Sequence, residues 1–421
     1  MASKPHAILS LPFSTRAEDP STPSLTTYLL SLISIKRSNL CVSADVHRTY
    51  ELLKIAEEVG DYICVLKTHA DIIDDFSERT IKGLQEISRR KNFLLFEDRK
   101  LGDIGSSFPL STLSILRYTM AQFQQRAQLT PHMYADTVQS QYTRGPLAIA
   151  TWAHLTNAHL FPGPSIVPTL FSAAQQALLS LNQTMETTIS AGTPRTSLDS
   201  SRDPTESIST TEPATTSERS LSSGSLSPQP IFEHTRRTGR KGSETTATTT
   251  ISQTFEYTAP RKPANLIRIL SQGEDEPQDR ATALEDLGPP PHARGLLLLA
   301  EMSSEGNLMT PEYTKACISA ARSNKEFVLG FVAQKSLNQE PGDAFLSLAP
   351  GISLPAEGET SAVKSDGKGQ KWRGPKEVIG KDGIDIVIVG RGILGAEDRA
   401  KEAERYRKAS WEAYEGRIGR K

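Results

Sequence analysis

Charged side chains gather in one short run, Glu97-Asp98-Arg99-Lys100-Leu101-Gly102-Asp103, directly after an apolar stretch. Side chains alternate across a strand, so we expect Asp98 and Lys100 to share one face, with Lys67 and His69 on one face of a neighbouring strand. Lysines interleaved with carboxylates stay charged, and the array sets an ammonium proton donor against a carboxylate that repels an anionic substrate group. Any one of these residues could be a simple salt bridge, but the whole set favours proton-transfer chemistry.

The elements that position these residues are predicted from short apolar runs that alternate with amphipathic helical patterns. The runs expected to be strands are residues 40–46, 62–67, 93–96, 147–152, 295–301, 327–332, 345–348 and 384–389. The expected helices are residues 49–59, 78–90, 165–180, 311–322 and about 397–414. Eight such units predict an α/β fold, a closed (β/α)8 TIM barrel with its site at the carboxyl ends of the strands. An open doubly wound sheet is the alternative, but no GxGxxG turn follows the first strand.

Composition separates the chain into three parts. Residues 183–290 are dominated by Ser, Thr, Pro, Gly, Glu and Arg, which predicts a disordered insertion between the fourth and fifth strand units. A basic patch at residues 236–241 within it is best interpreted as a solvated charge run. Residues 1–182 would then form the first half of the barrel, with an atypical insertion at 107–136, and residues 291–421 the second half.

Charge and cysteine content limit the possible partners. Lysine plus arginine number 48 against 49 aspartates plus glutamates, so nothing predicts binding to nucleic acid or to an anionic membrane. Cys41, Cys64 and Cys317 are scattered without metal-site spacing, which predicts buried, reduced thiols. No leader-like segment is seen, and no stretch reaches the roughly 18 apolar residues of a membrane span. We therefore expect a cytoplasmic, small-molecule enzyme.

The charged run also carries a family resemblance. Residues 96–105, FEDRKLGDIG, resemble the FEDRKFxDIG signature of orotidine 5'-phosphate decarboxylases, whose hallmark is the DxKxxD core. Further similar segments follow in the family's order: LCVSAD at 40–45, VLKTH at 65–69, WAH at 152–154, TNA at 156–158, RGLLLLAEMSSEG at 294–306, FVLGFVAQ at 327–334 and IVIVGRG at 386–392. The Ser/Thr-rich insertion is similar to one in the enzymes of some filamentous ascomycetes. The resemblance implies conversion of orotidine 5'-phosphate to UMP and CO2 without cofactor or metal.

Roles for individual residues are implied by the same resemblance. Lys100 matches the lysine that protonates C6 of the pyrimidine as CO2 leaves. Lys67, Asp98 and Asp103 complete a charged tetrad, and Asp103 would reach the partner's site in a homodimer together with Thr137. No family role transfers to His69, for which a supporting hydrogen bond is the expectation.

The implied substrate contacts come from several strand ends. Asp45 and Lys67 match groups that bind the ribose hydroxyls, and Ser303 matches the serine that binds the pyrimidine. Pro350 would line the base pocket. Gln370 and Arg391 match phosphate ligands, and the turn at Gly390 suits them because backbone amides at a helix start and a guanidinium both favour a phosphate dianion.

The sequence departs from the family pattern at several positions. Residues 107–136 resemble nothing in the family and separate Asp103 from Thr137, so they are either an evolved loop or a translated intron. Trp372 replaces a tyrosine that contacts phosphate, a loss worth on the order of 1 to 3 kcal/mol of binding. The smaller departures are Lys371 for a glutamine, Ala349 for a threonine and Ala148 for an arginine in the expected fourth strand.

These departures keep two other hypotheses open. One is a catalytically impaired relative that binds nucleotide or acts as a scaffold. The other is a sister decarboxylase of sugar phosphates, which shares the DxKxxD core but uses magnesium. Ser303, Pro350 and the loop around Gln370 argue against the second.

Overall fold

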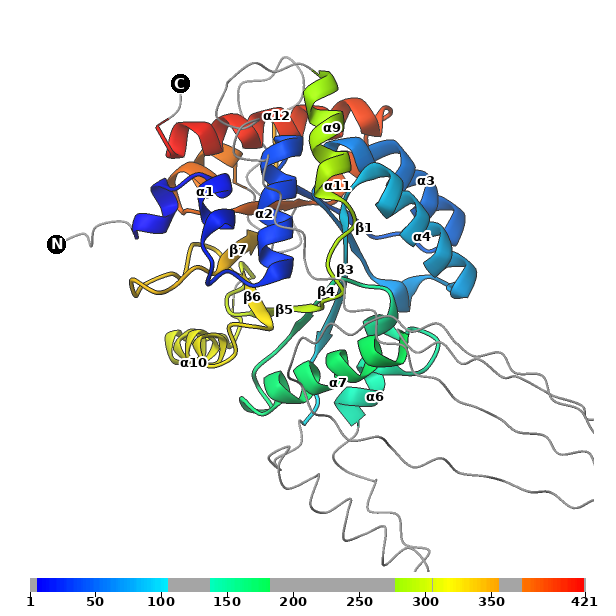
Figure 1. The fold of residues 1–421 in the computed structure, drawn as a ribbon, viewed down its shortest axis with the longest axis vertical. Coiled ribbons are helices and arrows are strands. Elements are labelled where there is room, and N and C mark those ends of the chain that lie inside the picture. Colours follow the sequence, from blue (N-terminus) through cyan, green and yellow to red (C-terminus); the bar gives the residue numbers. More distant parts are fainter. Residues whose placement is uncertain (1–5, 105–136, 182–276, 305, 356–372, 420–421) are drawn as a thin grey trace, which may run out of the picture. The chain divides into compact units, whose positions relative to one another are not determined.

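The computed structural model of the protein describes residues 6–104, 137–181, 277–304, 306–355 and 373–419. Eight parallel strands close into a barrel in the order β1 to β8, with each strand hydrogen-bonded to the next and β8 to β1 (Figure 1). The strands are β1 (Leu40–Ala44), β2 (Val65–Thr68), β3 (Leu94–Leu101), β4 (Leu155–Ala158), β5 (Gly295–Leu299), β6 (Val328–Val332), β7 (Leu346–Ala349) and β8 (Ile386–Val389). The predicted TIM barrel is confirmed.

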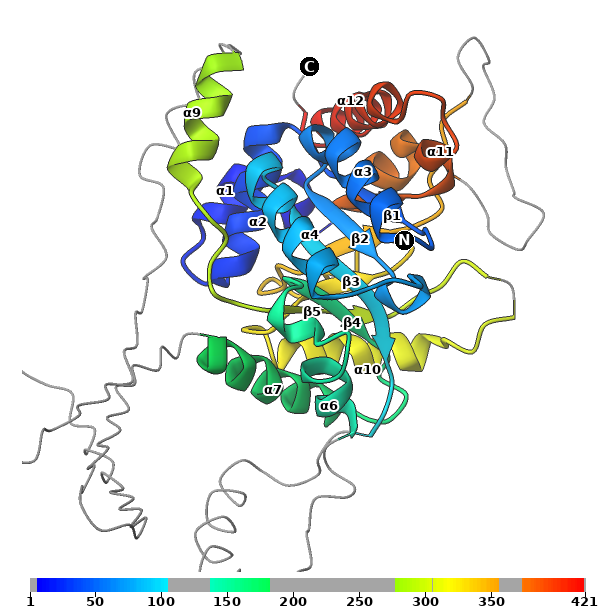
Figure 2. The same cartoon turned by 90° about the vertical axis from the view of Figure 1, so that its right-hand side faces the viewer.

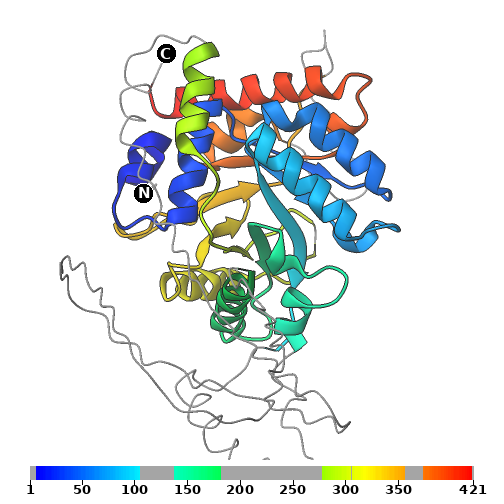
Figure 3. The ribbon, with the colours of Figure 1, turned by 45° about the vertical axis from the view of Figure 1, so that its right-hand side comes forward.

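Helices lie outside the strands, and α3, α4 and α10 follow the amphipathic patterns in the sequence (Figure 3). They are α1 (Phe13–Glu18), α2 (Ser24–Lys36), α3 (Thr49–Val59), α4 (Glu78–Lys91), α6 (Thr137–Thr143), α7 (Ile166–Leu181), α9 (Pro277–Leu287), α10 (Pro311–Arg322), α11 (Arg391–Leu394) and α12 (Arg399–Arg417). Local signals fix several starts: Thr310 caps α10, where Pro311 is the first residue, and Asp398 caps α12. None of the described helices is long and apolar enough to cross a membrane.

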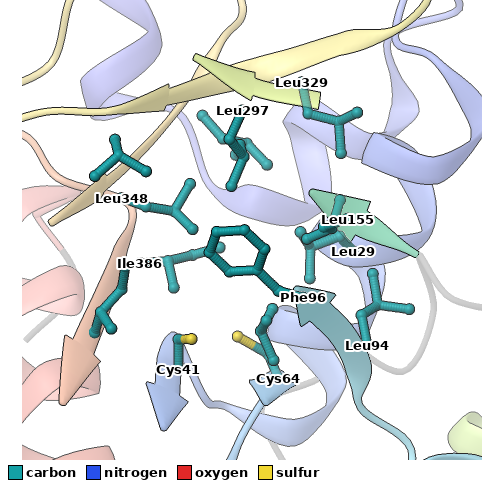
Figure 4. Packing of buried hydrophobic residues seen from close by; sticks show 14 of the residues in the cluster. Leu29, Cys41, Cys64, Leu94, Phe96, Leu155, Leu297, Leu329, Leu348 and Ile386 are labelled. Atoms are coloured by element: carbon teal, nitrogen blue, oxygen red, sulfur yellow. The ribbon is translucent and has the colours of Figure 1, made fainter. Parts of the chain in front are cut away.

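The barrel interior is filled by apolar side chains from every side (Figure 4). The fully buried Phe96 ring of β3 lies between Cys41, Cys64 and Leu155. All three cysteines are buried and free, as the sequence predicted. Strand β3 is the longest, at eight residues, and it extends past its neighbours (Figure 2). Its first four residues belong to the core, whereas its last residues carry the charged run to the carboxyl edge.

The expected fourth strand is wrong. Residues 147–152 form a turn and one 3-10 turn, Ile149–Thr151, and Ala148 has a left-handed backbone with φ of 34°. Their apolar character comes from burial of the turn, because periodicity cannot separate a short buried strand from a buried helical turn. The strand lies later, at Leu155–Ala158, and Ala148 is therefore not a strand residue.

The expected insertion also ends earlier than residue 290. Residues 107–136 and 183–276 lie outside the described residues, but α9 follows at Pro277–Leu287 and packs along α2. Ala283 of α9 is fully buried, and the Tyr28 hydroxyl of α2 donates to the Gly288 carbonyl at 3.2 Å. Helix α9 was not predicted from the sequence, because it has few apolar residues and lies next to a polar insertion. The described residues on both sides of the insertion belong to one compact unit.

A buried ion triad joins the two ends of the chain at β8. Asp385, which precedes β8, lies 2.7 Å from Arg16 Nη1 of α1 and 3.2 Å from Arg417 Nη2 of α12, and each of the three side chains is under 5% exposed. The Asp385 carboxylate also accepts from the Ser347 N–H at 3.1 Å. Two buried guanidinium groups thus share one carboxylate.

Replacing Asp385 with alanine is expected to lower the free energy of unfolding by about 3 to 5 kcal/mol, because two buried positive charges lose their counterion. Urea unfolding checks this value. Glu78→Gln, which breaks the exposed pair with Lys82, is the matched control and should leave stability unchanged. Equal effects of the two substitutions would contradict the assigned role of the triad.

Candidate active site

Polar side chains converge at the carboxyl ends of the strands. Lys67 lies on β2, Asp98 and Lys100 on β3, and Asp45 directly follows β1. Ser303 follows β5, Pro350 follows β7, and Gly390 and Arg391 follow β8. This is the edge at which (β/α)8 barrels place their active sites. Gln370, together with Lys371 and Trp372, lies outside the described residues.

Asp98 is the centre of the charged cluster. Its Oδ2 accepts from Lys67 Nζ at 2.7 Å, and its Oδ1 accepts from Lys100 Nζ at 2.7 Å. His69 Nε2 lies 3.2 Å from Asp98 Oδ2 and 2.9 Å from Lys67 Nζ. From the sequence we expected His69 to make a supporting hydrogen bond. In the structure His69 contacts two cluster residues, Asp98 and Lys67. Asp45 Oδ1 lies 3.7 Å from Lys67 Nζ and accepts from the Ser43 hydroxyl at 2.7 Å.

The opposite charges in this cluster stabilise one another's ionised forms. Burial alone would raise the pKa of Asp98, but the hydrogen bond from His69 and the two lysines hold it well below its ordinary range. Burial alone would likewise lower the pKa of Lys67, yet Asp98 and Asp45 outweigh it and raise that pKa. Asp98 is therefore ionised between two ammonium groups at neutral pH. A substrate carboxylate placed here would meet Asp98 as a repelling charge beside a proton donor.

Strict alternation along β3 does not hold at Lys100. The pairing of β3 with β4 shifts register between Glu97 and Leu101, and Lys100 has a left-handed φ of 51°. A bulge of this kind re-aims side chains near sites. Asp98 and Lys100 meet as expected, but the bulge brings them together rather than a regular pleat.

The structure separates Asp103 from the cluster of its own chain. Within the described residues, its carboxylate accepts from the Ile104 N–H at 2.7 Å and from Gln141 Nε2 at 3.4 Å, and it contacts none of the three cluster residues. Gln141 belongs to α6, which begins at Thr137. The chain segments on either side of residues 105–136 are thus in contact. Asp103 and the helix of Thr137 lie together.

Ser303, Pro350, Gly390 and Arg391 follow strands at the same edge of the barrel as the cluster. Asn307 Nδ2 donates to the Ser304 carbonyl at 2.7 Å, which holds the loop after β5 that carries Ser303. Gly390 directly precedes α11, so Arg391 begins a helical turn. A Cβ on Gly392 would clash with the hydroxyl of the buried Tyr406, so this turn favours a glycine. No group of three or more His, Cys, Asp or Glu among the described residues is arranged to hold a metal ion.

Sequence reasoning assigned no individual role to two polar residues of the site, Glu97 of the charged run and Asn157 of the TNA segment. Asn157 of β4 donates to Asp98 Oδ1 at 2.6 Å and accepts from the Lys100 N–H at 2.7 Å. Glu97 is buried beneath the cluster, where it accepts from the Thr68 hydroxyl at 2.6 Å and from the Ala70 N–H at 2.9 Å. Each residue is a polar side chain inside a predicted or family-like strand segment, where a buried polar group needs a hydrogen-bond partner.

The buried Glu97 carboxyl holds a proton unusually well. Burial raises its pKa to about 7, against opposing hydrogen bonds from Thr68 and Ala70. The unfolded chain releases this proton near the ordinary glutamate pKa of 4.5, so folding is favoured by proton binding between these two values. This stabilisation is present below about pH 4.5 and is lost as the pH rises to about 7.

Replacing Glu97 with glutamine is expected to remove that pH dependence. The stability of the wild type relative to Glu97→Gln should fall by about 2 to 3 kcal/mol between pH 5 and pH 8, at about 1.4 kcal/mol per pKa unit. Urea unfolding of both proteins at the two pH values measures it. A difference in stability that does not change with pH would rule out the assignment.

Fold and site together define the class. The protein is a (β/α)8-barrel enzyme whose strand ends hold a lysine, aspartate and lysine cluster suited to proton transfer next to an anionic group.

Comparisons with known proteins identify the family within this class. A family model described as "Orotidine 5'-phosphate decarboxylase / HUMPS family" matches residues 38–111 and 248–406. The curated "Orotidine 5'-phosphate decarboxylase" of Hypocrea jecorina is 38% identical, covering 98% of this chain and 99% of that protein. Proteins with the same name from Aureobasidium pullulans and Sordaria macrospora are 37% and 36% identical, covering 98% and 99% of this chain and 96% and 98% of theirs. The chain belongs to the orotidine 5'-phosphate decarboxylase / HUMPS family.

Proposed function

We propose that the protein is an orotidine 5'-phosphate decarboxylase of the fungal type, which converts orotidine 5'-phosphate to UMP and CO2 in pyrimidine synthesis. The observation that carries this proposal is the ionised Asp98 between Lys67 and Lys100 at the strand ends. The family match and the names of relatives that span nearly the whole chain support it. These relatives favour the nucleotide substrate over a sugar phosphate within the family.

The reaction breaks the bond between C6 and the carboxylate, leaving the electron pair on C6, and forms a C6–H bond. Lys100 Nζ supplies the proton and regains one from solvent. Asp98 opposes the substrate carboxylate in the ground state, and this repulsion is relieved as CO2 leaves. Lys67 remains positive beside Asp98 and completes the preorganised field.

Other residues bind the parts of the substrate that do not react. Asp45 and Lys67 bind the ribose hydroxyls. Ser303 hydrogen-bonds the pyrimidine ring, and Pro350 packs against the face of that ring. Arg391 and the Gly390 turn bind the phosphate dianion with Gln370, because a guanidinium offers several donors in a fixed fork. Binding energy at the phosphate is then available to lower the barrier at C6.

The proposed active form is a homodimer in the cytosol. Among the described residues, Asp103 makes no contact with its own cluster, and its carboxylate accepts from Gln141 of the helix that begins at Thr137. Asp103 and Thr137 would both reach the site of a second copy, where Asp103 would complete a tetrad with Lys67, Asp98 and Lys100. The buried free cysteines suit a reducing compartment.

Mixing two inactive variants is expected to restore activity if Asp103 acts across the dimer. Lys100→Ala and Asp103→Ala subunits, mixed equally and re-associated, place one native site in each hybrid, so about a quarter of all sites should be active by random pairing. Mixing Lys100→Ala with Lys67→Ala is the control and should restore nothing, because both residues belong to one chain's cluster. Failure of the first mixture, with hybrids formed, would refute the shared site.

A genetic test addresses the activity itself. A strain that lacks orotidine 5'-phosphate decarboxylase should grow without uracil when it expresses this chain, because rescue requires turnover rather than binding. The Lys100→Ala chain serves as the control. Absence of rescue with abundant folded protein would favour the nucleotide-binding or scaffold alternative.

A further inference from the structure

The backbone at Lys100 is strained, and the pairing of β3 with β4 shows where the strain arises. Glu97 pairs with Thr156 and Leu101 pairs with Ala158, so four steps along β3 match only two along β4. The chain absorbs the excess at Lys100, whose φ of 51° is uncommon for any residue with a side chain. Such a conformation is energetically unfavourable and persists only where its surroundings impose it.

Asn157 lies at the centre of this bulge and is only 1% exposed. Its Oδ1 accepts from the Lys100 N–H at 2.7 Å, and its Nδ2 donates to Asp98 Oδ1 at 2.6 Å. The orientation of the amide follows from its partners, since a backbone N–H can only donate and an ionised carboxylate can only accept. Asp98 Oδ1 also accepts from Lys100 Nζ at 2.7 Å, which closes a ring through all three residues.

This ring matters because Asp98 is the partner that holds the Lys100 ammonium among the described residues. That side chain is 40% exposed, whereas Asp98 is 12% exposed and Lys67 is 8% exposed. Rotation of Asp98 or relaxation of the bulge would therefore move the Lys100 ammonium, and a misplacement of about 1 Å can cost on the order of a hundredfold in rate.

We propose that Asn157 is a positioning residue for decarboxylation: its one amide fixes both the strained backbone of Lys100 and the carboxylate that aims the Lys100 ammonium. The inference rests on the proposed role of Lys100 as proton donor. Asn157 acts through Lys100 and Asp98, and it does not touch the reacting atoms.

Kinetics of three variants test this role. Asn157→Ala is expected to lower kcat about a hundredfold while KM for orotidine 5'-phosphate changes less than about threefold. The matched control is Thr156→Val on the same strand, whose hydroxyl donates to the Glu97 carbonyl outside the ring. It should keep kcat within about threefold. A folded Asn157→Ala protein with a kcat as high as this control would overturn the proposal.

Asn157→Asp gives a readout that a merely structural role would not move, and it serves equally if the alanine variant does not fold. A protonated aspartic acid can still accept from the Lys100 N–H and donate to Asp98, as the amide does. Its pKa is raised by the adjacent carboxylate, so kcat should be near that of the wild type at low pH and fall as the pH rises. A kcat profile with the same pH dependence as the wild type would overturn the proposal.

A crystal structure of Asn157→Ala separates this inference from the proposed function. Lys100 should leave the left-handed region and its Nζ should separate from Asp98. Retention of both features would refute the role of Asn157 whatever the activity. An inactive wild type would instead refute the proposed function.

Discussion

Lys100→Ala is expected to lower kcat for decarboxylation by at least about 10⁴-fold, because the variant loses both the proton donor and a positive charge beside the developing carbanion. The affinity for UMP should change far less, since the residues proposed to bind the phosphate and ribose belong to other strands or follow them. Stability should not suffer, because the lysine side chain is 40% exposed. Steady-state kinetics with equilibrium binding of UMP measures both effects.

The matched control for Lys100→Ala is Lys82→Ala on α4, where the lysine is 72% exposed and pairs with Glu78 in the same helix. That variant should keep the kinetic constants of the wild type. If Lys100→Ala kept more than about 1% of the wild-type kcat, a different group would have to supply the proton.

Asp98→Asn is expected to lower kcat by about 10³-fold or more, because the neutral amide neither repels the substrate carboxylate nor holds two ammonium groups in place. Loss of this negative charge also removes the main support for the pKa of the buried Lys67, which should fall. The substitution preserves shape, so the barrel should fold normally.

Ground-state binding distinguishes repulsion by Asp98 from simple disorder. With Asp98→Asn, affinity for orotidine 5'-phosphate should improve relative to UMP, because only the first ligand carries the carboxylate that Asp98 opposes. Asp74→Asn, at a 62% exposed aspartate beside Arg48, is the control and should leave the ratio unchanged. An unchanged ratio in Asp98→Asn would remove repulsion from the mechanism.

The sequence predicted the barrel well because its strands are buried on both faces and helices such as α3, α4 and α10 are amphipathic. It missed α2, in which 11 of 13 residues are buried, since a helix that is apolar on all sides shows no periodicity. It misplaced the fourth strand because the buried turn ending at Trp152 is more apolar than β4, which carries Thr156 and Asn157. A local run of apolar residues indicates that a segment is buried, but it does not show whether the segment is a strand or a helical turn.

Contact among Lys67, Asp98 and Lys100 was predicted from alternation along neighbouring strands. The bulge at Lys100 could not be predicted, because its register depends on pairing with β4, which local sequence placed wrongly. The role of Asn157 could not be predicted either, because its two hydrogen bonds form only when β4 is paired with β3. Residues that act through a neighbouring strand require the fold to be known.

Every role proposed for the charged cluster depends on one step, the transfer of a proton to C6 as orotidine 5'-phosphate loses CO2. The step is tested by incubating purified protein with this substrate in D2O and following CO2 release and the NMR spectrum of the nucleotide product. We expect one CO2 for each UMP formed, with deuterium at C6, and no such product with Lys100→Ala. A folded wild-type protein that binds UMP but releases no CO2 from orotidine 5'-phosphate would contradict the proposed function.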